Sequence, residues 1–482
     1  MRISNAAIES QPVSTNVPAS ESNQSDSAKR RETAITGRVI DESGQAIPNA
    51  AINVRRVGMQ ANLSRSVGTD QDGRFRADDL TAGAYSVGAY APGYVAAADS
   101  IERRYYRPGE AVTLRMVKGG VITGTVTNAE GEAMAAARVS AIRVRDGEGR
   151  LIRGAGLSGG VNTRQSDDRG VYRLYGLSGG TYLIAVNGGI GSYYGSSGYD
   201  GDAPTYHPST TRDAAAEVIV HTGDEIRGID VRYRGDRGYV VSGTLSGSLG
   251  TNSRIAVLVS LVRASSGAIE SSSYTANGQG EFAVYGIPDG EYDLGAQMGI
   301  GTENAAASAA RRVVVKGADV TGLDLSLAPL GGISGRLVLE PLSEAERKGD
   351  CKGKRGASPE ETVIIARRDE RAVAKGQSAL NTFAPNDGTP DEKGEFKISS
   401  LIAGRYRIEL SLPAEDWFVR SITLPAPAAS KQNDVTDAGL PLGPGQRIVD
   451  LTATIAEGAS ALRGKVVAAP EGATLPSHLR VH

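Results

Sequence analysis

The chain has 482 residues and an almost even charge balance, with 53 Lys and Arg against 55 Asp and Glu and a net charge of −2. This balance gives no positive field suited to nucleic acid, and the single cysteine, Cys351, excludes an intrachain disulfide. No run approaches the roughly eighteen consecutive apolar residues of a membrane-spanning helix, so we expect no transmembrane segment in this chain.

Residues 1–33 are rich in Ser, Asn, Ala and Pro. Such a composition cannot bury enough apolar surface to fold, so we expect a disordered lead. The segment also lacks the apolar core of a signal peptide. If the protein is exported, its true start is expected upstream of Met1.

The first predicted strand follows an apolar-x-Gly-x-apolar pattern that recurs along the chain. Four copies occupy residues 35–39, 122–126, 241–245 and 333–337. A fifth copy at 462–466 is followed by few residues. We therefore interpret residues 459–482 as the start of a truncated fifth repeat.

A second pattern lies downstream of each of the four strands. It reads Asp/Asn-x-x-Gly-x-Phe/Tyr-x4-Leu/Ile-x-x-Gly-x-Tyr, and we call it the box. The Asp or Asn side chain can bond to the backbone of a tight turn, where Gly supplies a positive φ. Alternation then places the aromatic residues in a core. The copies begin and end at Asp70 and Tyr85, Asp167 and Tyr182, Asn277 and Tyr292, and Asp391 and Tyr406.

Turns about every ten residues predict six or seven short strands per unit, which is typical of antiparallel β-sandwiches. The connections between units are short, so we expect a semi-rigid string of beads in which each unit contacts only its neighbours in sequence. The predicted division has a lead at 1–33, repeats at 34–118, 119–236, 238–329 and 331–457, and the partial repeat at 459–482.

One family has the same arrangement of motifs. The order Gly37-x-Val39-x-Asp41-x-x-Gly44 followed by the first box resembles the carboxypeptidase regulatory-like domain. The chain is also similar to the B-type repeats of bacterial collagen adhesins. The resemblance is strong in copies one and two, and covers the second halves of copies three and four. It implies an all-β tandem array of Greek-key, transthyretin-like antiparallel β-sandwiches, without chemistry of their own and exported from a bacterial cell.

Two features of the related families are missing. The metallocarboxypeptidase zinc motif begins His-x-x-Glu, and none of His207, His221, His478 and His482 lies in it. The adhesin repeats often carry an isopeptide lysine in the first strand, where this chain has Arg38, Thr125, Thr244 and Arg336. Residues 154–160 match glycine-rich catalytic patterns, but no helix follows them. We expect no catalytic residues, no metal and no cofactor.

Binding residues are expected in the loops that differ between copies, chiefly 187–211 and 341–361. The first loop holds Tyr193, Tyr194, Tyr199 and Tyr206 among Gly, Ser and Asp. Tyrosine beside small polar residues suits an adaptable binding loop, and a phenol ring can stack on a sugar. The alternative is a long flexible insertion, with Tyr206 packing over the sandwich edge.

Together these features predict a non-enzymatic scaffold or interaction protein that is secreted or at the cell surface, extracellular or periplasmic. Its expected partners are other proteins or polysaccharide, not nucleic acid. Two alternatives remain. One is a carbohydrate-binding protein, since related folds include starch-binding domains. The other is an accessory region of a larger surface enzyme or outer-membrane receptor.

Overall fold

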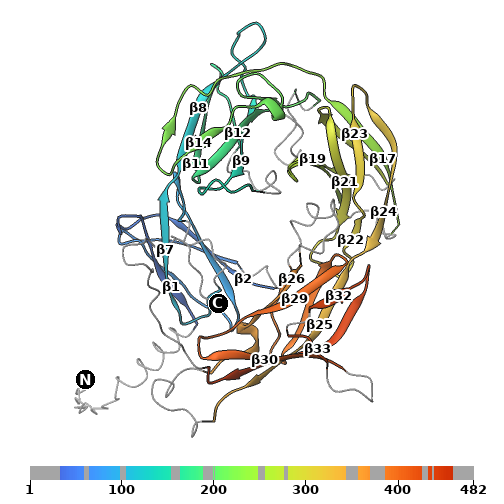
Figure 1. Ribbon diagram of the computed structural model, residues 1–482. Coiled ribbons are helices and arrows are strands. Elements are labelled where there is room, and N and C mark those ends of the chain that lie inside the picture. The colour runs from blue at the N-terminus through green and yellow to red at the C-terminus, as the bar shows by residue number, and fades with distance from the viewer. Residues whose placement is uncertain are drawn as a thin grey trace, which may run out of the picture.

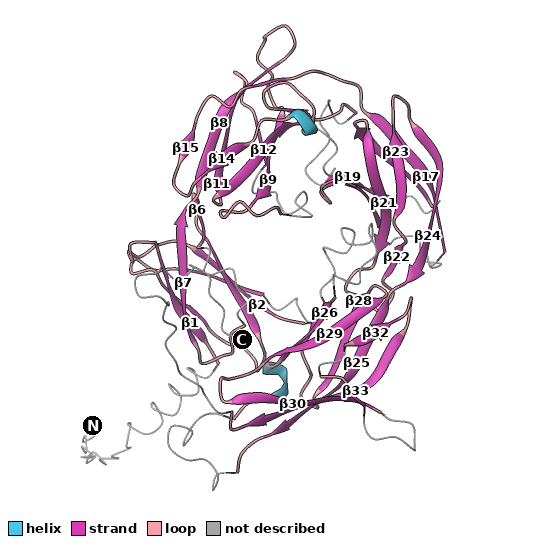
Figure 2. Cartoon of the chain, in the orientation of Figure 1, coloured by secondary structure: helices cyan, strands magenta, loops and turns pink. Residues whose placement is uncertain are grey.

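The computed structural model describes most of the chain between Thr33 and Ala459. The described residues are 33–58, 64–97, 105–152, 163–187, 199, 201–247, 256–275, 280–343, 356–369, 386–425, 433–436 and 439–459. Within them the regular structure is strands and two short 3-10 turns, η3 (Arg212–Ala214) and η5 (Pro359–Glu361) (Figure 2). The all-β prediction is confirmed. The disordered lead and the partial fifth repeat lie outside the described residues and stay predictions.

Unit one, as we call the strands up to Lys118, has two facing sheets. Its strands are β1 (Ile35–Ile40), β2 (Ala51–Arg56), β3 (Ser64–Gly68), β4 (Arg74–Ala77), β5 (Tyr85–Tyr90), β6 (Tyr94–Ala96) and β7 (Ala111–Lys118). The sheet orders are β4-β1-β7-β6 and β3-β2-β5. Both sheets contribute apolar side chains to one core, which includes Ile35, Ile52, Phe75 and Tyr85.

Unit two repeats this plan. Its strands are β8 (Gly120–Thr127), β9 (Arg138–Arg145), β10 (Thr163–Gln165), β11 (Val171–Leu177), β12 (Gly180–Val186), β13 (Thr205–Tyr206), β14 (Val218–Val220), β15 (Glu225–Ile226) and β16 (Val231–Arg232). One sheet is ordered β11-β8-β15, with β16 also on β8. The other is ordered β10-β9-β12-β13, with β14 also on β12. The core lies between the sheets and includes Ile122, Tyr172 and Tyr182.

In unit three the two layers join into one sheet. The strands are β17 (Tyr239–Gly247), β18 (Val257–Arg263), β19 (Ile269–Thr275), β20 (Glu281–Ile287), β21 (Gly290–Met298), β22 (Ala306–Ser308), β23 (Arg311–Val315) and β24 (Val320–Pro329). The order is β19-β18-β21-β22-β24-β17-β20, with β23 on β21. Strand β22 connects the layers because it pairs with both β21 and β24.

Unit four again has two sheets. The strands are β25 (Gly331–Glu340), β26 (Val363–Arg368), β27 (Asp387–Gly388), β28 (Glu395–Leu401), β29 (Gly404–Ser411), β30 (Trp417–Leu424), β31 (Asn433–Asp434), β32 (Leu440–Leu442) and β33 (Arg447–Glu457). The orders are β28-β25-β33-β30-β31 and β27-β26-β29-β32. Trp417 is 5% exposed and packs with Leu337 and Ile455, so it is a core residue.

The first strand of each unit departs from the antiparallel expectation. The first strand runs parallel to strands near the end of the same unit: β1 to β7, β8 to β15 and β16, β17 to β24, and β25 to β33. This pairing explains the glycine of the first-strand pattern. A Cβ on Gly37, Gly124, Gly243 or Gly335 would collide with a backbone carbonyl of the parallel partner strand or of the segment beside it.

The turn that opens the box has the predicted structure. The Oδ1 of Asp167 accepts backbone N–H bonds from Arg169 at 3.0 Å and Val171 at 2.7 Å. Asp70 and Asp391 accept the same pair of bonds in their copies. The box glycines that follow have φ between +71° and +83°. Turn capping and backbone conformation therefore account for these positions.

The capping carboxylate makes the turn sensitive to acid. The Val171 N–H bond, followed by the Arg169 side chain, lowers the pKa of Asp167 below its ordinary value of 3.8. A carboxylate with a lowered pKa stabilises the folded state above the unfolded pKa, and this contribution is lost as pH falls through the folded pKa. We expect Asp167→Asn, which keeps an oxygen acceptor, to lose less stability than wild type between about pH 5 and about pH 2. Urea denaturation at each pH tests this, and parallel curves would contradict it.

The tyrosine that ends each box forms a tyrosine corner, which the sequence analysis did not identify. Its hydroxyl donates to the carbonyl four residues upstream: Tyr85 to Thr81 at 3.0 Å, Tyr182 to Ser178 at 2.7 Å, Tyr292 to Pro288 at 2.9 Å and Tyr406 to Ile402 at 2.8 Å. Immunoglobulin-like sandwiches use the same device. The bond fixes the path of the chain into the second strand of the box.

The tyrosine corner has a measurable cost of removal. Burial raises the pKa of Tyr182 to about 12, and its ring is 1% exposed. Tyr182→Phe keeps the ring but leaves the Ser178 carbonyl without this donor, so we expect a loss of about 1 kcal/mol in the free energy of unfolding. Tyr285→Phe, whose ring is 54% exposed, is the control. Equal effects in urea denaturation would argue against the corner.

An arginine lies opposite each of these tyrosines. The cross-strand pairs are Arg56 with Tyr85, Arg143 with Tyr182, Arg263 with Tyr292, and Arg368 with Tyr406. In each pair the guanidinium lies over the glycine two residues before the tyrosine, where a Cβ would meet it. The Gly-x-Tyr half of the box therefore forms a turn, and its glycine also leaves room for the guanidinium of the facing arginine.

The four units are arranged in a ring, and the predicted string of beads is wrong (Figure 1). Unit one contacts unit four, although they are at opposite ends of the array. The Ala84 N–H donates to the Glu360 carbonyl at 3.0 Å, and the Thr389 hydroxyl donates to the Val57 carbonyl at 3.2 Å. The short connections bend the array until its ends meet, so each unit has two neighbours.

Candidate functional site: the two variable loops

The loop 187–211 lies only partly within the described residues. Tyr193 and Tyr194 lie outside them, and so do residues 154–160. Tyr199 is half-buried against the core of unit two, and its ring meets that of Tyr233 edge-on at 5.7 Å between centroids. Tyr206 is 2% exposed. The structure therefore places two of the four tyrosines in intramolecular contacts, and ligand binding by this loop stays a prediction.

Tyr206 belongs to a buried polar cluster between units two and three, which we call the 2–3 clasp. Its hydroxyl donates to Glu270 Oε1 at 3.4 Å and accepts from Arg212 Nη1 at 3.3 Å. On the unit-three side, Arg263 Nε is 3.1 Å from Glu270 Oε2, and Arg263 Nη1 is 3.5 Å from Asp213 Oδ2. Turn η3 thus presents Arg212 and Asp213 to the opposite charges of unit three.

The charged side chains of the 2–3 clasp are buried except for that of Asp213, which is 77% exposed. The side chains of Arg263 and Arg212 are each 7% exposed and that of Glu270 is 2% exposed. Burial, the largest single cause, lowers the pKa of Arg263, but Glu270, Tyr292 and Asp213 together outweigh it and the net shift is upward. Burial, and then the Glu270 charge, raise the pKa of Tyr206. Arg263 therefore stays charged and Tyr206 neutral, which holds units two and three together through opposite charges.

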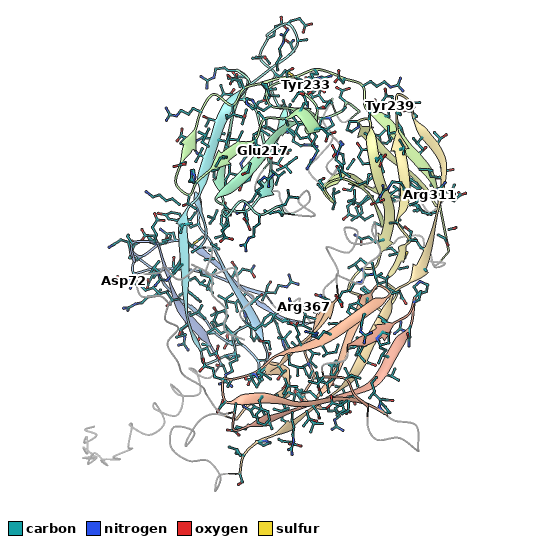
Figure 3. The ribbon with its side chains drawn as sticks, viewed as in Figure 1. Asp72, Glu217, Tyr233, Tyr239, Arg311 and Arg367 are labelled. Carbon is teal, nitrogen blue, oxygen red and sulfur yellow. The ribbon has the colours of Figure 1, made fainter. Side chains whose placement is uncertain are left out.

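The 2–3 clasp uses the arginine that faces the box tyrosine. Arg263 donates to the Tyr292 hydroxyl at 3.2 Å and lies 5.3 Å from the ring centroid. Figure 3 labels Tyr233 and Tyr239 on either side of the connection between the two units. Arg263 therefore contacts the box tyrosine of its own unit and also Asp213 of unit two.

The second variable loop, 341–361, ends at the contact between units four and one. In η5 the side chain of Glu361 is fully buried, and its Oε2 lies 3.6 Å from Arg107 Nη1. The Tyr105 hydroxyl donates to Asp387 Oδ2 at 3.3 Å nearby. Both described 3-10 turns therefore lie between units (Figure 2). The loops that differ between copies supply contacts between units, which the sequence analysis did not foresee.

A pocket of about 270 Å³ lies where units three and four meet. Its charged residues are Glu303 from unit three and Lys397 and Arg447 from unit four. Glu303 already forms an ion pair with Lys397, and its carbonyl accepts from Arg447 at 3.2 Å. The Gly301 N–H also donates to Ser400 Oγ at 2.9 Å. The pocket is thus crossed by contacts that join the two units.

The described residues show no metal site and no membrane-spanning helix. Among the described residues, no group of three or more His, Cys, Asp and Glu side chains is placed to hold a metal ion. No helix in the described part of the chain is long and apolar enough to cross a membrane.

Unit one is similar to a known domain family. Residues 34–115 match the carboxypeptidase regulatory-like domain. The match confirms the resemblance for unit one, and the recurring strands, boxes and tyrosine corners extend the same plan through units two to four. No curated protein matches the chain.

Solved structures with some similarity include one Bacillus protein and two pilins. The Bacillus anthracis TIE protein is 14% identical, and the match covers 61% of this chain and 50% of the TIE protein, with a TM-score of 0.16. The minor pilin GBS52 of Streptococcus agalactiae is 12% identical over 42% of this chain and 96% of its own, with a TM-score of 0.22. The shaft pilin SpaA of Lactobacillus rhamnosus GG is 11% identical, and the match covers 42% of this chain and 97% of the pilin, with a TM-score of 0.19. Because these identities and TM-scores are low, we infer neither the function nor the domain arrangement of this chain from these structures.

Proposed function

We propose that the chain is a non-enzymatic modular scaffold at the cell surface, in which each unit is a separately folding domain and the ring holds the four at fixed angles. The observation that carries this proposal is where the distinctive residues lie. The box residues serve turns, core and corners, and the described parts of the variable loops serve contacts between units. Residues of a catalytic protein would instead converge on a cleft.

The scaffold is expected to present its outer strands and remaining loops to other proteins or to polysaccharide of the envelope. A regulatory-like domain in unit one supports an exported accessory role. Inter-domain contacts of this polar kind resemble those between separate proteins, and ion-paired turns at the joints would set the angles between the presented faces.

An activity and retention experiment tests the proposal. The purified full chain is incubated with peptide and polysaccharide substrates, and is passed over immobilised envelope proteins and glycans. We expect retention by a protein and no turnover of any substrate. Turnover that persists through purification would contradict the non-enzymatic assignment. Retention on a glycan that Tyr199→Ala abolishes would favour the carbohydrate-binding alternative instead.

A further inference from the structure

The contact between units one and four differs from the other joints in how it is held. The other three joints are covalent connections, whereas this one joins residues up to 332 positions apart, as in Thr389 and Val57. In the described residues, no hydrophobic core cluster contains side chains from both units. The closing contact therefore rests on polar groups and can separate without breaking the chain or exposing a core.

Each half of this contact keeps an internal partner when the other half is absent. Arg107 is bonded within unit one to Glu110, from Nε to Oε1 at 3.1 Å. Glu361 is bonded within unit four, where its Oε2 accepts from the Ser358 backbone N–H at 3.2 Å. Both side chains are thus held ready for pairing in the open state, so that closing needs little rearrangement.

The two surfaces are different from each other and complementary. Unit one offers a cation at Arg107 and the N–H donor of Ala84, while unit four offers the Glu361 carboxylate and the Glu360 carbonyl. An interface between two unlike surfaces closes a ring when the geometry allows, and otherwise joins successive copies head to tail. The partner that fits either surface is the other surface, on the same chain or on another.

We propose that units one and four form an exchangeable latch, and that a second copy of this chain binds at the opened latch, unit one of one copy to unit four of the other. Closure within one chain is favoured by an effective concentration of the order of millimolar. Exchange therefore becomes important where copies are crowded, and this inference holds whether or not the scaffold lies at the cell surface.

Disulfide trapping tests the exchange directly. A Cβ built on Gly58 lies 3.5 Å from the Thr389 Cβ, which matches the separation in a disulfide. In a Cys351→Ser background, Gly58→Cys and Thr389→Cys are prepared as two separate chains, oxidised alone and as a mixture. Only exchange between copies brings the two new thiols together. The double variant in one chain reports closure of the ring, and Ser43→Cys, an exposed position away from the latch, replaces Gly58→Cys as the collision control.

We expect the mixture to form covalent dimer beyond either chain alone and beyond the Ser43→Cys control. Its initial dimer fraction should rise roughly tenfold for a tenfold rise in concentration, as mass action requires of an intermolecular contact. A mixture no better than its controls would overturn the proposal, and so would a double variant that fails to close. Because Gly58 has a φ of +99° and its variant can misfold, the mass of wild type is also measured by light scattering up to about the millimolar range. Monomer alone across that range would equally overturn it.

Discussion

Phe75→Ala is expected to lower the stability of unit one by about 3–5 kcal/mol. The ring is 5% exposed in the core between the two sheets of that unit, so truncation leaves a cavity as well as removing buried apolar area. Tyr90→Ala, in the same unit but 53% exposed, is the control and should change stability by less than about 1 kcal/mol. Hydrogen exchange measured by mass spectrometry separates the units.

The pattern of protection distinguishes a ring of domains from one cooperative body. Peptides of unit one should lose protection in Phe75→Ala, while those of unit three, which has its own core, keep it. Trp417 is the only tryptophan, so its fluorescence reports the unfolding of unit four. In Phe75→Ala the unfolding midpoint of unit four should change only by the stability that its contact with unit one contributes. Equal loss of protection in all four units would contradict separate folding.

Arg263→Met is expected to cost about 3–5 kcal/mol, because it leaves the Glu270 carboxylate buried without its nearest cation. Arg212, 3.9 Å away, compensates in part, so the lower end of that range is expected. Arg312→Met is the matched control in the same unit. Arg312 is paired with Asp293 at 2.7 Å, and its side chain is 50% exposed while that of Asp293 is 13% exposed. Because water reaches one side of this pair, we expect a smaller cost than in Arg263→Met.

A double substitution separates pairing from burial in the 2–3 clasp. Arg263→Met with Glu270→Leu removes both charges, and should recover part of the lost stability because no buried carboxylate is left unpaired. Recovery is incomplete because Arg212, 7% exposed, loses Glu270 and keeps its bond to the Tyr206 hydroxyl. Urea denaturation measures the stability of the single and the double variant. Hydrogen exchange of β19 and of the segment around η3 shows where protection is lost. If protection around η3 in unit two is unchanged in Arg263→Met, the clasp does not hold the units together, because Arg263 and Glu270 both belong to unit three.

The box was predictable because its determinants are local. Asp167 caps a turn through residues two and four positions away, and the aromatic residues follow strand alternation, so the sequence alone carries both signals. The tyrosine corner is local too, with a fixed offset of four residues, and could have been found from the Gly-x-Tyr spacing. The direction of β7 beside β1 could not, because strand alternation reads the same in parallel and antiparallel pairs.

The contacts between units were not predictable for a different reason. The arginine opposite each box tyrosine lies at a separation that varies with the intervening loop, so Arg143 and Arg263 do not align by spacing. Tyr206 was placed in a binding loop because tyrosines beside Gly and Ser suit one, but its hydroxyl meets Glu270 of the next unit. Nothing in the local sequence links Arg107 to Glu361, because only the bend at every joint brings them together.

Small-angle X-ray scattering of the dilute chain tests the central claim, that the four units close into a ring. We expect the distance distribution of the closed ring, with unit one beside unit four. Arg107→Glu, which opposes the Glu361 carboxylate with a like charge, should lengthen the maximum dimension. A wild-type profile already as long as four sandwiches in a row, and unchanged by Arg107→Glu, would contradict the account.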